Sequence, residues 1–226
     1  MSSRFAIVAG AGSGLGQAAA LRLHTNGLTV AAVDRSETGL KELPAGIRTV
    51  VADATDPAVP GPLVDRLVAE VGPPDVLVNT IGAYGMGDAL AVTPETLRQM
   101  IDVNVGAALW LTQAVVPHMR RRGSGAIVHV AARQGVEPTA GVAAYGLSKA
   151  ALVHLVRTLD VELLGTGIRV NVVLPQVMAT AKNKALFPPE ALTGAVEPDA
   201  VAEIIAFLVS DAGVPTSGAL VPAYGS

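Results

Sequence analysis

Short apolar runs alternate with longer segments of helical periodicity along the whole chain. The runs are rich in Val, Ile, Leu and Ala, which is typical of strands buried on both faces of a parallel sheet. We expect strands at residues 5–9, 28–33, 47–52, 75–80, 125–131, 168–174 and 219–221. Because helical segments separate successive strands, the pattern predicts an α/β domain with a doubly wound parallel sheet and right-handed crossovers.

Two of the helical segments carry clear start signals. The pairs Asp56-Pro57 and Thr93-Pro94 each place a possible capping side chain directly before a proline, which is favoured at the first helical position. Further helices are expected at residues 17–25, 103–119, 142–164 and 199–210. Asn104 lies inside one of these helices, where asparagine is usually neutral or unfavourable. We therefore expect either a kink or a water-binding role at that position.

Composition narrows the class of protein. Of the 226 residues, 50% are hydrophobic and 15% are charged, the mean hydropathy is +0.48 and the net charge is −3. A chain of this length is expected to form one domain, residues 1–226, with a substantial core. It has no cysteine, which excludes disulfides and thiol catalysis. His24, His118 and His154 show no metal-ligand spacing, so no metal site is expected.

Neither a membrane nor a nucleic acid is expected as a partner. No run comes near the roughly 18 uninterrupted apolar residues of a membrane-spanning helix, and the first apolar run is too short for a signal peptide. Basic residues cluster only at Arg120–Arg122, where a helix is expected to end and cations are favoured. These features fit a cytoplasmic enzyme.

The first strand runs into a glycine-rich turn and then into a helix. This order forms a phosphate-binding unit, because glycines let the backbone approach a pyrophosphate and the helix N-terminus supplies N–H donors. The candidate contacts are Gly10, Gly12, Ser13, Gly14, Leu15 and Gly16. The glycines at 10, 14 and 16 depart from the strict G-x-G-x-x-G spacing, and a purely structural tight turn is the alternative.

Asp34 follows the second strand, 24 residues after Gly10. A carboxylate at that place suits the adenosine ribose hydroxyls of a dinucleotide and would repel a 2′-phosphate, so NAD is favoured over NADP. Arg35 comes next and could offset part of that repulsion. A solvated turn residue or a helix cap is the alternative for Asp34.

Tyr145 and Lys149 stand four residues apart at the start of the helix expected at 142–164. Their side chains would lie on one helix face, one turn apart. A free tyrosine has a pKa of about 10, and an adjacent ammonium is expected to lower that pKa because it favours the phenolate. The two residues are therefore a candidate proton-transfer pair, with a packed ring and a solvated charge as the alternative.

With these residues in place, nearly the whole chain resembles the short-chain dehydrogenase/reductase family. The features that match in order and spacing are the Gly10, Gly14 and Gly16 turn, Asp53, Asn79 with Gly82, Asn104, and the pair Tyr145 and Lys149. The resemblance implies a single-domain Rossmann-like fold of about seven strands and an oxidoreductase that uses NAD, or less readily NADP. It also implies a small alcohol or carbonyl compound as the substrate.

The resemblance assigns cofactor contacts to individual residues. Asp53 and Ala54 would hold the adenine, and Asn79 would buttress the central strands. The remaining implied contacts are Gly82, Pro175, Val177, which would bind the carboxamide, and Thr180, which would lie near the phosphates.

For catalysis, the resemblance implies that Tyr145 passes a proton to or from the substrate oxygen while hydride moves at the nicotinamide C4. Lys149 would bind the nicotinamide ribose and lower the pKa of Tyr145. Asn104 would place a water that relays protons to Lys149.

The sequence departs from the family pattern at the end of the fifth strand. The family has a serine thirteen residues before the tyrosine, and here that position is Ala132, next to Ala131. Loss of a comparable donor elsewhere costs about 10²–10³ in rate. Arg133, Gln134 or the substrate itself could replace the missing hydroxyl.

Smaller departures occur at Thr80 and Ile81, at Gln176 after Pro175, and at Ala9. The segment at about 176–197 is short for a substrate lid, which suggests a small substrate or an open site.

Two other interpretations stay open. One is a catalytically impaired sensor or partner subunit that binds dinucleotide, which the Ala131-Ala132 pair supports. The other is isomerisation, elimination or double-bond reduction at the same site. The helices at 103–119 and 142–164 are apolar nearly all round and need cover on every side, so a homodimer or homotetramer is expected. His129 is expected to be a core residue.

Overall fold

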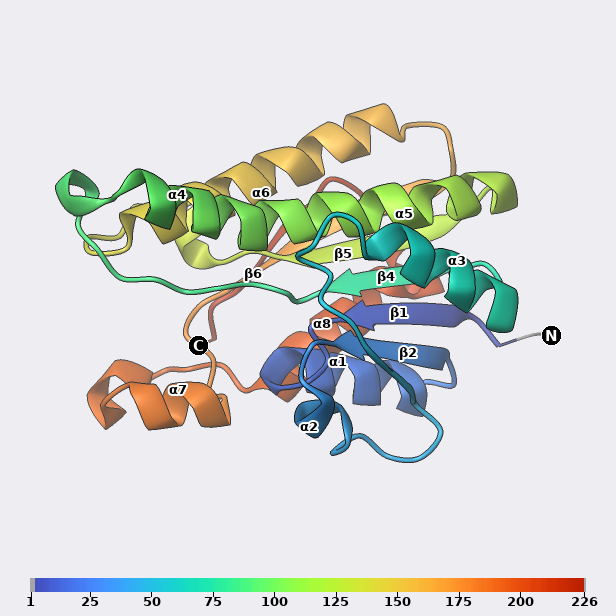
Figure 1. Cartoon of the computed structure of the whole chain (residues 1–226), viewed down its shortest axis with the longest axis horizontal. Helices are drawn as coiled ribbons and strands as arrows, with labels where there is room; N and C mark the ends of the chain where they lie inside the picture. The colour runs from blue at the N-terminus through green and yellow to red at the C-terminus, as the bar shows by residue number, and fades with distance from the viewer. Residues whose placement is uncertain (1–2, 226) are drawn as a thin grey trace.

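A parallel sheet runs through the centre of the computed structural model, which describes residues 3–225 (Figure 1). Within these residues the sheet has seven strands in the order β3-β2-β1-β4-β5-β6-β7. The strands are β1 Phe5–Ala9, β2 Thr29–Asp34, β3 Arg48–Val51, β4 Val76–Asn79, β5 Gly125–Val130, β6 Ile168–Pro175 and β7 Leu220–Ala223. The expected doubly wound parallel sheet is confirmed. Its strand order reverses between β1 and β4, which is where ligands of such sheets bind.

Helices cover both faces of the sheet (Figure 1). The longer ones are α1 Gly14–Thr25, α3 Pro60–Glu70, α5 Ala107–Arg122, α6 Ala143–Glu162 and α8 Pro198–Val209. The shorter ones are α2 Glu37–Leu40, α4 Pro94–Ile101, α7 Ala181–Leu186 and the 3₁₀ turns η1 Ala89–Ala91, η3 Arg133–Gly135, η4 Pro189–Leu192 and η5 Asp211–Gly213. Successive strand residues serve opposite layers: Ile7 packs in the core under α3, α5 and α6, whereas Val8 packs in the core under α1 and α8.

A single π turn, Asp102–Gly106, interrupts the helical run between α4 and α5. Thr93 opens α4 as expected, since its hydroxyl accepts a hydrogen bond from the Thr96 N–H at 3.2 Å. The π turn lies at Asn104, where the sequence left a kink open as an explanation. Turns of this kind are rare and are frequent at functional sites.

The helix from α4 through α5, Pro94–Arg122, is long and apolar enough to cross a membrane by length and composition alone. The sequence did not suggest this candidate, because Gly106 and Pro117 interrupt its apolar run. Leu111 and Met119 from the same helix are buried in the core beneath it. A core helix passes the same test, so the finding is only weak evidence for a membrane partner.

The start expected for the third helix was wrong. Asp56-Pro57 forms a local turn, in which the Asp56 carboxylate accepts from the Ala58 N–H, and α3 begins at Pro60. A helix begun at Pro57 would need the N–H that Pro60 lacks and would press its ring against the Asp56 carbonyl. Pro60 is accommodated only in the first turn, so it sets the helix start.

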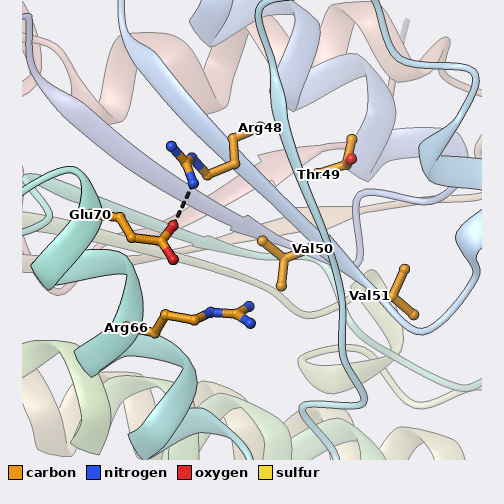
Figure 2. Close-up of a pocket in the computed structure, with 6 residues that line it drawn as sticks. All are labelled: Arg48, Thr49, Val50, Val51, Arg66 and Glu70. Atoms are coloured by element: carbon orange, nitrogen blue, oxygen red, sulfur yellow. Dashed lines mark hydrogen bonds and ion pairs between the residues drawn. The ribbon is translucent and has the colours of Figure 1, made fainter.

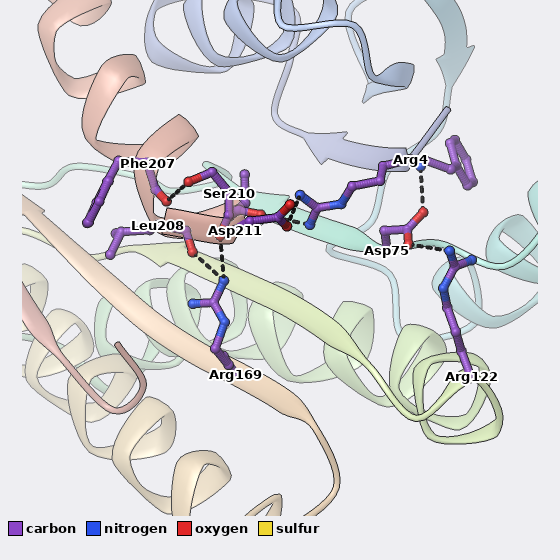
Figure 3. A network of polar contacts seen from close by, with 10 residues as sticks. Arg4, Asp75, Arg122, Arg169, Phe207, Leu208, Ser210 and Asp211 are labelled. Carbon is purple, nitrogen blue, oxygen red and sulfur yellow. Dashed lines mark hydrogen bonds and ion pairs between the residues drawn. The ribbon is translucent and has the colours of Figure 1, made fainter. Parts of the chain in front are cut away.

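A polar network ties the amino ends of the strands to the end of α8 (Figure 3). Arg4 and Arg169 donate to the carbonyls of Val209 and Leu208, each at 2.7 Å, and so satisfy acceptors that a helix end leaves open. Asp75, which is buried, accepts from the Phe5 N–H and pairs with Arg122, each at 2.7 Å. The polar contacts at the amino ends of the strands therefore serve stability. The candidate site residues follow the carboxyl ends.

Candidate active site

The glycine-rich turn between β1 and α1 leaves no room for side chains. A Cβ on Gly12 would lie 2.6 Å from the Asp34 carboxyl carbon, and one on Gly16 would lie 1.9 Å from the Gly10 carbonyl oxygen. Glycine at these two positions therefore lets the turn pack closely on Asp34 and on its own backbone. Helix α1 begins at Gly14, three residues earlier than expected, so the turn and the helix N-terminus are continuous.

Asp34 is bound beneath this turn. Its carboxylate accepts from the Gly12 N–H at 2.9 Å and from the Ser36 N–H at 2.8 Å. The structure therefore brings Asp34 against the backbone of the glycine-rich turn. Arg35 is mostly exposed and its guanidinium lies 3.8 Å from Asp53, so it pairs weakly with that carboxylate.

Asp53 and Ala54 follow β3 on the same side of the sheet. The Asp53 carboxylate accepts from both the hydroxyl and the N–H of Thr55, at 2.6 and 3.0 Å. The Thr55 hydroxyl, then the Thr55 N–H and then Arg35 lower the pKa of Asp53, while partial burial opposes them. Ala54 is buried in the core.

Thr80 fastens the loop after β4 to the glycine-rich turn. Its hydroxyl lies 3.0 Å from the Ala9 carbonyl and 3.2 Å from the Gly10 carbonyl, and it can donate to either. Its N–H also donates to the Ala9 carbonyl, at 2.9 Å. The departure from the family pattern at this position therefore keeps the turn anchored.

Asn79 and His129 form a buried polar connection across β4 and β5. The Asn79 carbonyl oxygen accepts from the Ile81 N–H at 3.1 Å, and its amide nitrogen lies 3.4 Å from His129 Nδ1. His129 Nε2 lies 3.1 Å from the Thr112 hydroxyl, which itself donates to the Ala108 carbonyl. Burial, and secondarily the charge of Lys149, lowers the pKa of His129 to about 4. His129 is therefore a neutral core histidine, as expected.

The π turn places Asn104 where three elements meet. Its carbonyl oxygen accepts from the Ala83 N–H at 2.9 Å, and its amide nitrogen donates to the Ser148 hydroxyl at 2.9 Å and to the Ala83 carbonyl at 3.0 Å. A Cβ on Gly82 would lie 2.9 Å from the Asn104 carbonyl oxygen and 3.0 Å from Lys149 Nζ. Glycine at position 82 therefore lets Asn104 and Lys149 approach from both sides. Sequence reasoning missed Ser148.

Tyr145 and Lys149 lie on one face of α6, with Lys149 Nζ 5.9 Å from the centre of the Tyr145 ring. Lys149 is buried and donates to the Val130 carbonyl at 3.1 Å. Burial lowers the pKa of Lys149 to about 8.

The lowering of the Tyr145 pKa that we expected from Lys149 is wrong for this structure. Burial raises the pKa of Tyr145, and Tyr84, whose ring centre lies 5.0 Å away, raises it further. The physical reason is that the ammonium of Lys149 is turned to a backbone carbonyl and lies nearly 6 Å from the ring, whereas desolvation acts on the hydroxyl directly.

Ala131 and Ala132 are both buried at the end of β5. Turn η3 follows them and packs against α6, since a Cβ on Gly135 would lie 2.9 Å from the Lys149 carbonyl carbon. Arg133, a candidate to replace the missing hydroxyl, is bound elsewhere. It donates to Glu137 at 2.6 Å and to Gln176 at 2.9 Å, and its guanidinium lies 4.9 Å from the centre of the Tyr224 ring.

The segment after β6 folds back over the glycine-rich turn. The Val177 carbonyl accepts from the Val196 N–H at 2.9 Å, which closes the base of the segment. Thr180 caps α7, and a Cβ on Gly14 would lie 3.1 Å from its methyl group. Thr180 is thus at the turn, whereas helix α7 and turn η4 were not expected. Pro175 ends β6 directly before this segment.

Two surface hollows lie outside this crevice. One, of about 300 Å³, is lined by β3 and α3 residues including the ion pair Arg48–Glu70 (Figure 2). The other, of about 380 Å³, is lined by residues such as His118 and Arg121. Neither contains a residue predicted for the site. Among residues 3–225, no three His, Asp or Glu side chains gather in a way that could hold a metal ion.

The chain is similar to known dehydrogenases and reductases. Residues 4–191 match the family described as "short chain dehydrogenase". The chain is 38% identical over 180 residues to 2,3-dihydro-2,3-dihydroxybenzoate dehydrogenase of Escherichia coli, covering 80% of this chain and 71% of that protein. It is 30% identical over 237 residues to a 3-oxoacyl-[acyl-carrier-protein] reductase of Thermotoga maritima, covering 98% and 96%.

Solved structures agree with these relatives. An actinorhodin polyketide ketoreductase variant with NADPH superposes with a TM-score of 0.92 at 28% identity, covering 100% of this chain and 98% of that one. The 3-ketoacyl-(acyl-carrier-protein) reductase of Brucella melitensis, complexed with NADH, gives 0.90 at 26% identity, covering 98% and 97%. Both cofactors therefore occur among the neighbours.

Proposed function

Because the chain belongs to the short-chain dehydrogenase family, we propose that it transfers hydride between NAD(H) and a small alcohol or carbonyl compound, with Tyr145 as the proton donor and acceptor. The observation that carries the proposal is the meeting of Asn104 and Lys149 at Gly82, with Tyr145 one turn before Lys149 on the same face of α6. This convergence lies beside the glycine-rich turn, which Thr80 links to the same loop.

The residues of the crevice suit a dinucleotide. The phosphates would lie at the glycine-rich turn and the N-terminus of α1, with Thr180 nearby. Asp34 would hold the adenosine ribose and disfavour a 2′-phosphate, which supports NAD over NADP. Asp53 and Ala54 would border the adenine, and Val177 would bind the carboxamide. When bound, the nicotinamide supplies the hydride for reduction and accepts it in oxidation.

Tyr145 is set up as an acid. Because burial raises its pKa, the phenol is protonated near neutral pH and can donate to a carbonyl oxygen. Reduction of one carbonyl consumes one NADH and one proton: hydride forms the new C–H bond, the Tyr145 proton forms the O–H bond, and Tyr145 is then reprotonated from solvent. Lys149, an ammonium below about pH 8, would bind the nicotinamide ribose.

With Ala132 in place of the family's serine, this site has one polar group fewer than the family pattern. The substrate oxygen would receive a hydrogen bond from Tyr145 but none from the floor of the pocket. Arg133 would have to leave Glu137 and Gln176 to take that role. We therefore expect the reaction to be slow.

The test is NADH consumption over a panel of small aldehydes, ketones and quinones. We expect turnover by the native protein, about 10²–10³-fold faster turnover by Ala132→Ser, and loss of turnover in Tyr145→Phe. Turnover by Ala132→Ser alone would instead support a sensor or partner subunit, the second candidate, which the buried pair Ala131 and Ala132 favours. Product analysis distinguishes carbonyl reduction from isomerisation, elimination or double-bond reduction.

We further propose a homodimer or homotetramer. Val161 and Leu164 at the end of α6 are 73% and 83% exposed, and an exposed apolar helix end is stabilised by a second copy. A molar mass in solution equal to one chain at all concentrations would contradict this. The proposal places the enzyme in the cytoplasm without nucleic-acid or membrane partners, which cell fractionation tests.

A further inference from the structure

Aromatic side chains are scarce in this protein, and they gather at Tyr145. The whole chain has three Phe, three Tyr and one Trp. The rings of Tyr84 and Tyr145 meet edge to face, with centres 5.0 Å apart and planes at 69°. Phe187 meets the other side of Tyr84 in the same manner, at 5.9 Å and 79°. Three of the seven aromatic residues thus form one cluster at the proposed proton donor.

The three rings come from separate parts of the chain. Tyr84 lies in the loop after β4, Tyr145 in the first turn of α6, and Phe187 directly after α7. Through Tyr84, the cluster therefore joins the segment after β6, which carries Phe187, to helix α6, which carries Tyr145. Tyr84 is 45% exposed, and Phe187 is only partly buried. The rings are not core residues, and their unburied surface is available to a ligand.

The two residues after Ala131 add little polarity. Ala132 is a buried apolar side chain, and the charge of Arg133 is neutralised by Glu137 at 2.6 Å. A site with aromatic side chains beside the reacting hydroxyl suits a ligand with an apolar body and a polar reacting group. The partly exposed rings of Tyr84 and Phe187 offer apolar surface against which a carbocyclic ring can pack.

We propose that the substrate is a neutral cyclic ketone or alcohol whose carbocyclic ring packs against Tyr84 and Phe187 while its oxygen meets the Tyr145 hydroxyl. This rests on the proposed function and names the substrate class of the same site. A ring is favoured over an open chain of equal size because it has fewer rotatable bonds to immobilise on binding. We expect about a tenfold preference for the ring, which is the scale of one aromatic contact and a few frozen bonds.

The experiment compares cyclohexanone with 2-hexanone, which has the same number of carbons. Their dissociation constants are measured by ligand-observed NMR titration of the protein saturated with NAD⁺, so that no ketone is consumed. The native protein is expected to bind cyclohexanone about tenfold more tightly than 2-hexanone. Tyr84→Ala and Phe187→Ala should each reduce this preference several-fold, whereas Tyr84→Phe, which keeps the ring, should retain it.

Phe207→Ala is the matched control. Phe207 is a half-exposed ring on α8, at the opposite end of the sheet (Figure 3), and its removal should leave the preference unchanged. Equal affinities for the two ketones, no measurable binding of cyclohexanone, or an unchanged preference in both alanine variants would each overturn the inference. Because binding is measured without turnover, failure of the hydride-transfer proposal would show separately, as a ring preference without NADH consumption.

Discussion

Replacing the buried Lys149 by methionine should make the protein more stable near neutral pH while abolishing catalysis. Lys149 is 4% exposed, and its ammonium has one backbone acceptor, the Val130 carbonyl. Burial lowers its pKa from the ordinary value of 10.5 to about 8. Keeping the ammonium in the folded protein below pH 8 therefore costs about 3 kcal/mol, at about 1.4 kcal/mol for each pKa unit.

The sign of the pH dependence follows from where each state releases the proton. The unfolded chain holds it up to about pH 10.5, and the folded protein releases it near pH 8. Between these values the unfolded state binds more protons, so the Lys149 contribution to the free energy of unfolding rises with pH. It is fully present above pH 10.5 and is lost as the pH falls through 8. Titrations elsewhere in the molecule are common to both proteins and largely cancel in the difference.

Methionine fills a similar volume without charge but leaves the Val130 carbonyl unpaired, which costs about 1–3 kcal/mol. At pH 7 we therefore expect Lys149→Met to exceed the native protein in the free energy of unfolding by up to about 2 kcal/mol. The free energy of unfolding of Lys149→Met, taken relative to that of the native protein, should fall by about 1.4 kcal/mol per pH unit between pH 8 and pH 10.

Urea unfolding followed by circular dichroism, at fixed protein concentration and several pH values, measures both quantities. Lys184→Met is the control. Lys184 is 57% exposed, and its ammonium pairs weakly with the Glu197 carboxylate, at 4.0 Å. Its replacement should therefore change the free energy of unfolding by a small amount that is the same at every pH. A gap that stays constant from pH 7 to pH 10, or a variant less stable than the native protein at pH 7, would refute the reasoning.

Three further changes test other parts of the structure. Asp34→Asn should raise the ratio of NADPH to NADH affinity by about tenfold or more, because it removes the charge that repels a 2′-phosphate; fluorescence titration with both cofactors measures this ratio. Arg122→Met should lower the free energy of unfolding by about 1–2 kcal/mol, since it leaves the buried Asp75 without its ion pair, whereas the exposed Arg98→Met should cost at most about 0.5 kcal/mol. Thr93→Ala should cost about 1 kcal/mol in urea unfolding through loss of the α4 cap, and an unchanged midpoint would contradict the capping role.

Much of the architecture follows from local patterns in the sequence. Apolar runs mark the strands because strands buried on both faces must be apolar throughout their length. The crevice is also predictable in outline, since the glycine-rich turn, Asp34 and Asn79 all follow strands at the carboxyl edge of the sheet. Tyr145 and Lys149 share a helix face by spacing alone.

The remaining features depend on contacts between distant residues. Phe187 lies about a hundred positions from Tyr84, and nothing near either residue indicates that their rings meet. Lys149 was expected to lower the Tyr145 pKa because spacing shows proximity but not burial, and burial decides the direction here. The start of α3 was misjudged for a local reason, because Pro60 outweighs the capping signal at Asp56.

The pairing of α1 with α8 has a consequence for how the protein is made. These helices lie side by side in Figure 1 and share one layer of the core, yet residues 14–25 and 198–209 come from opposite ends of the sequence. During synthesis α1 emerges early, and Ala19, Ala20 and Leu23 stay without their final neighbours until almost the whole chain has left the ribosome. Parallel sheets that need contacts between such distant segments fold slowly, through intermediates that expose apolar surface. Helix α1 therefore gains this part of its core only after residues 198–209 have been synthesised.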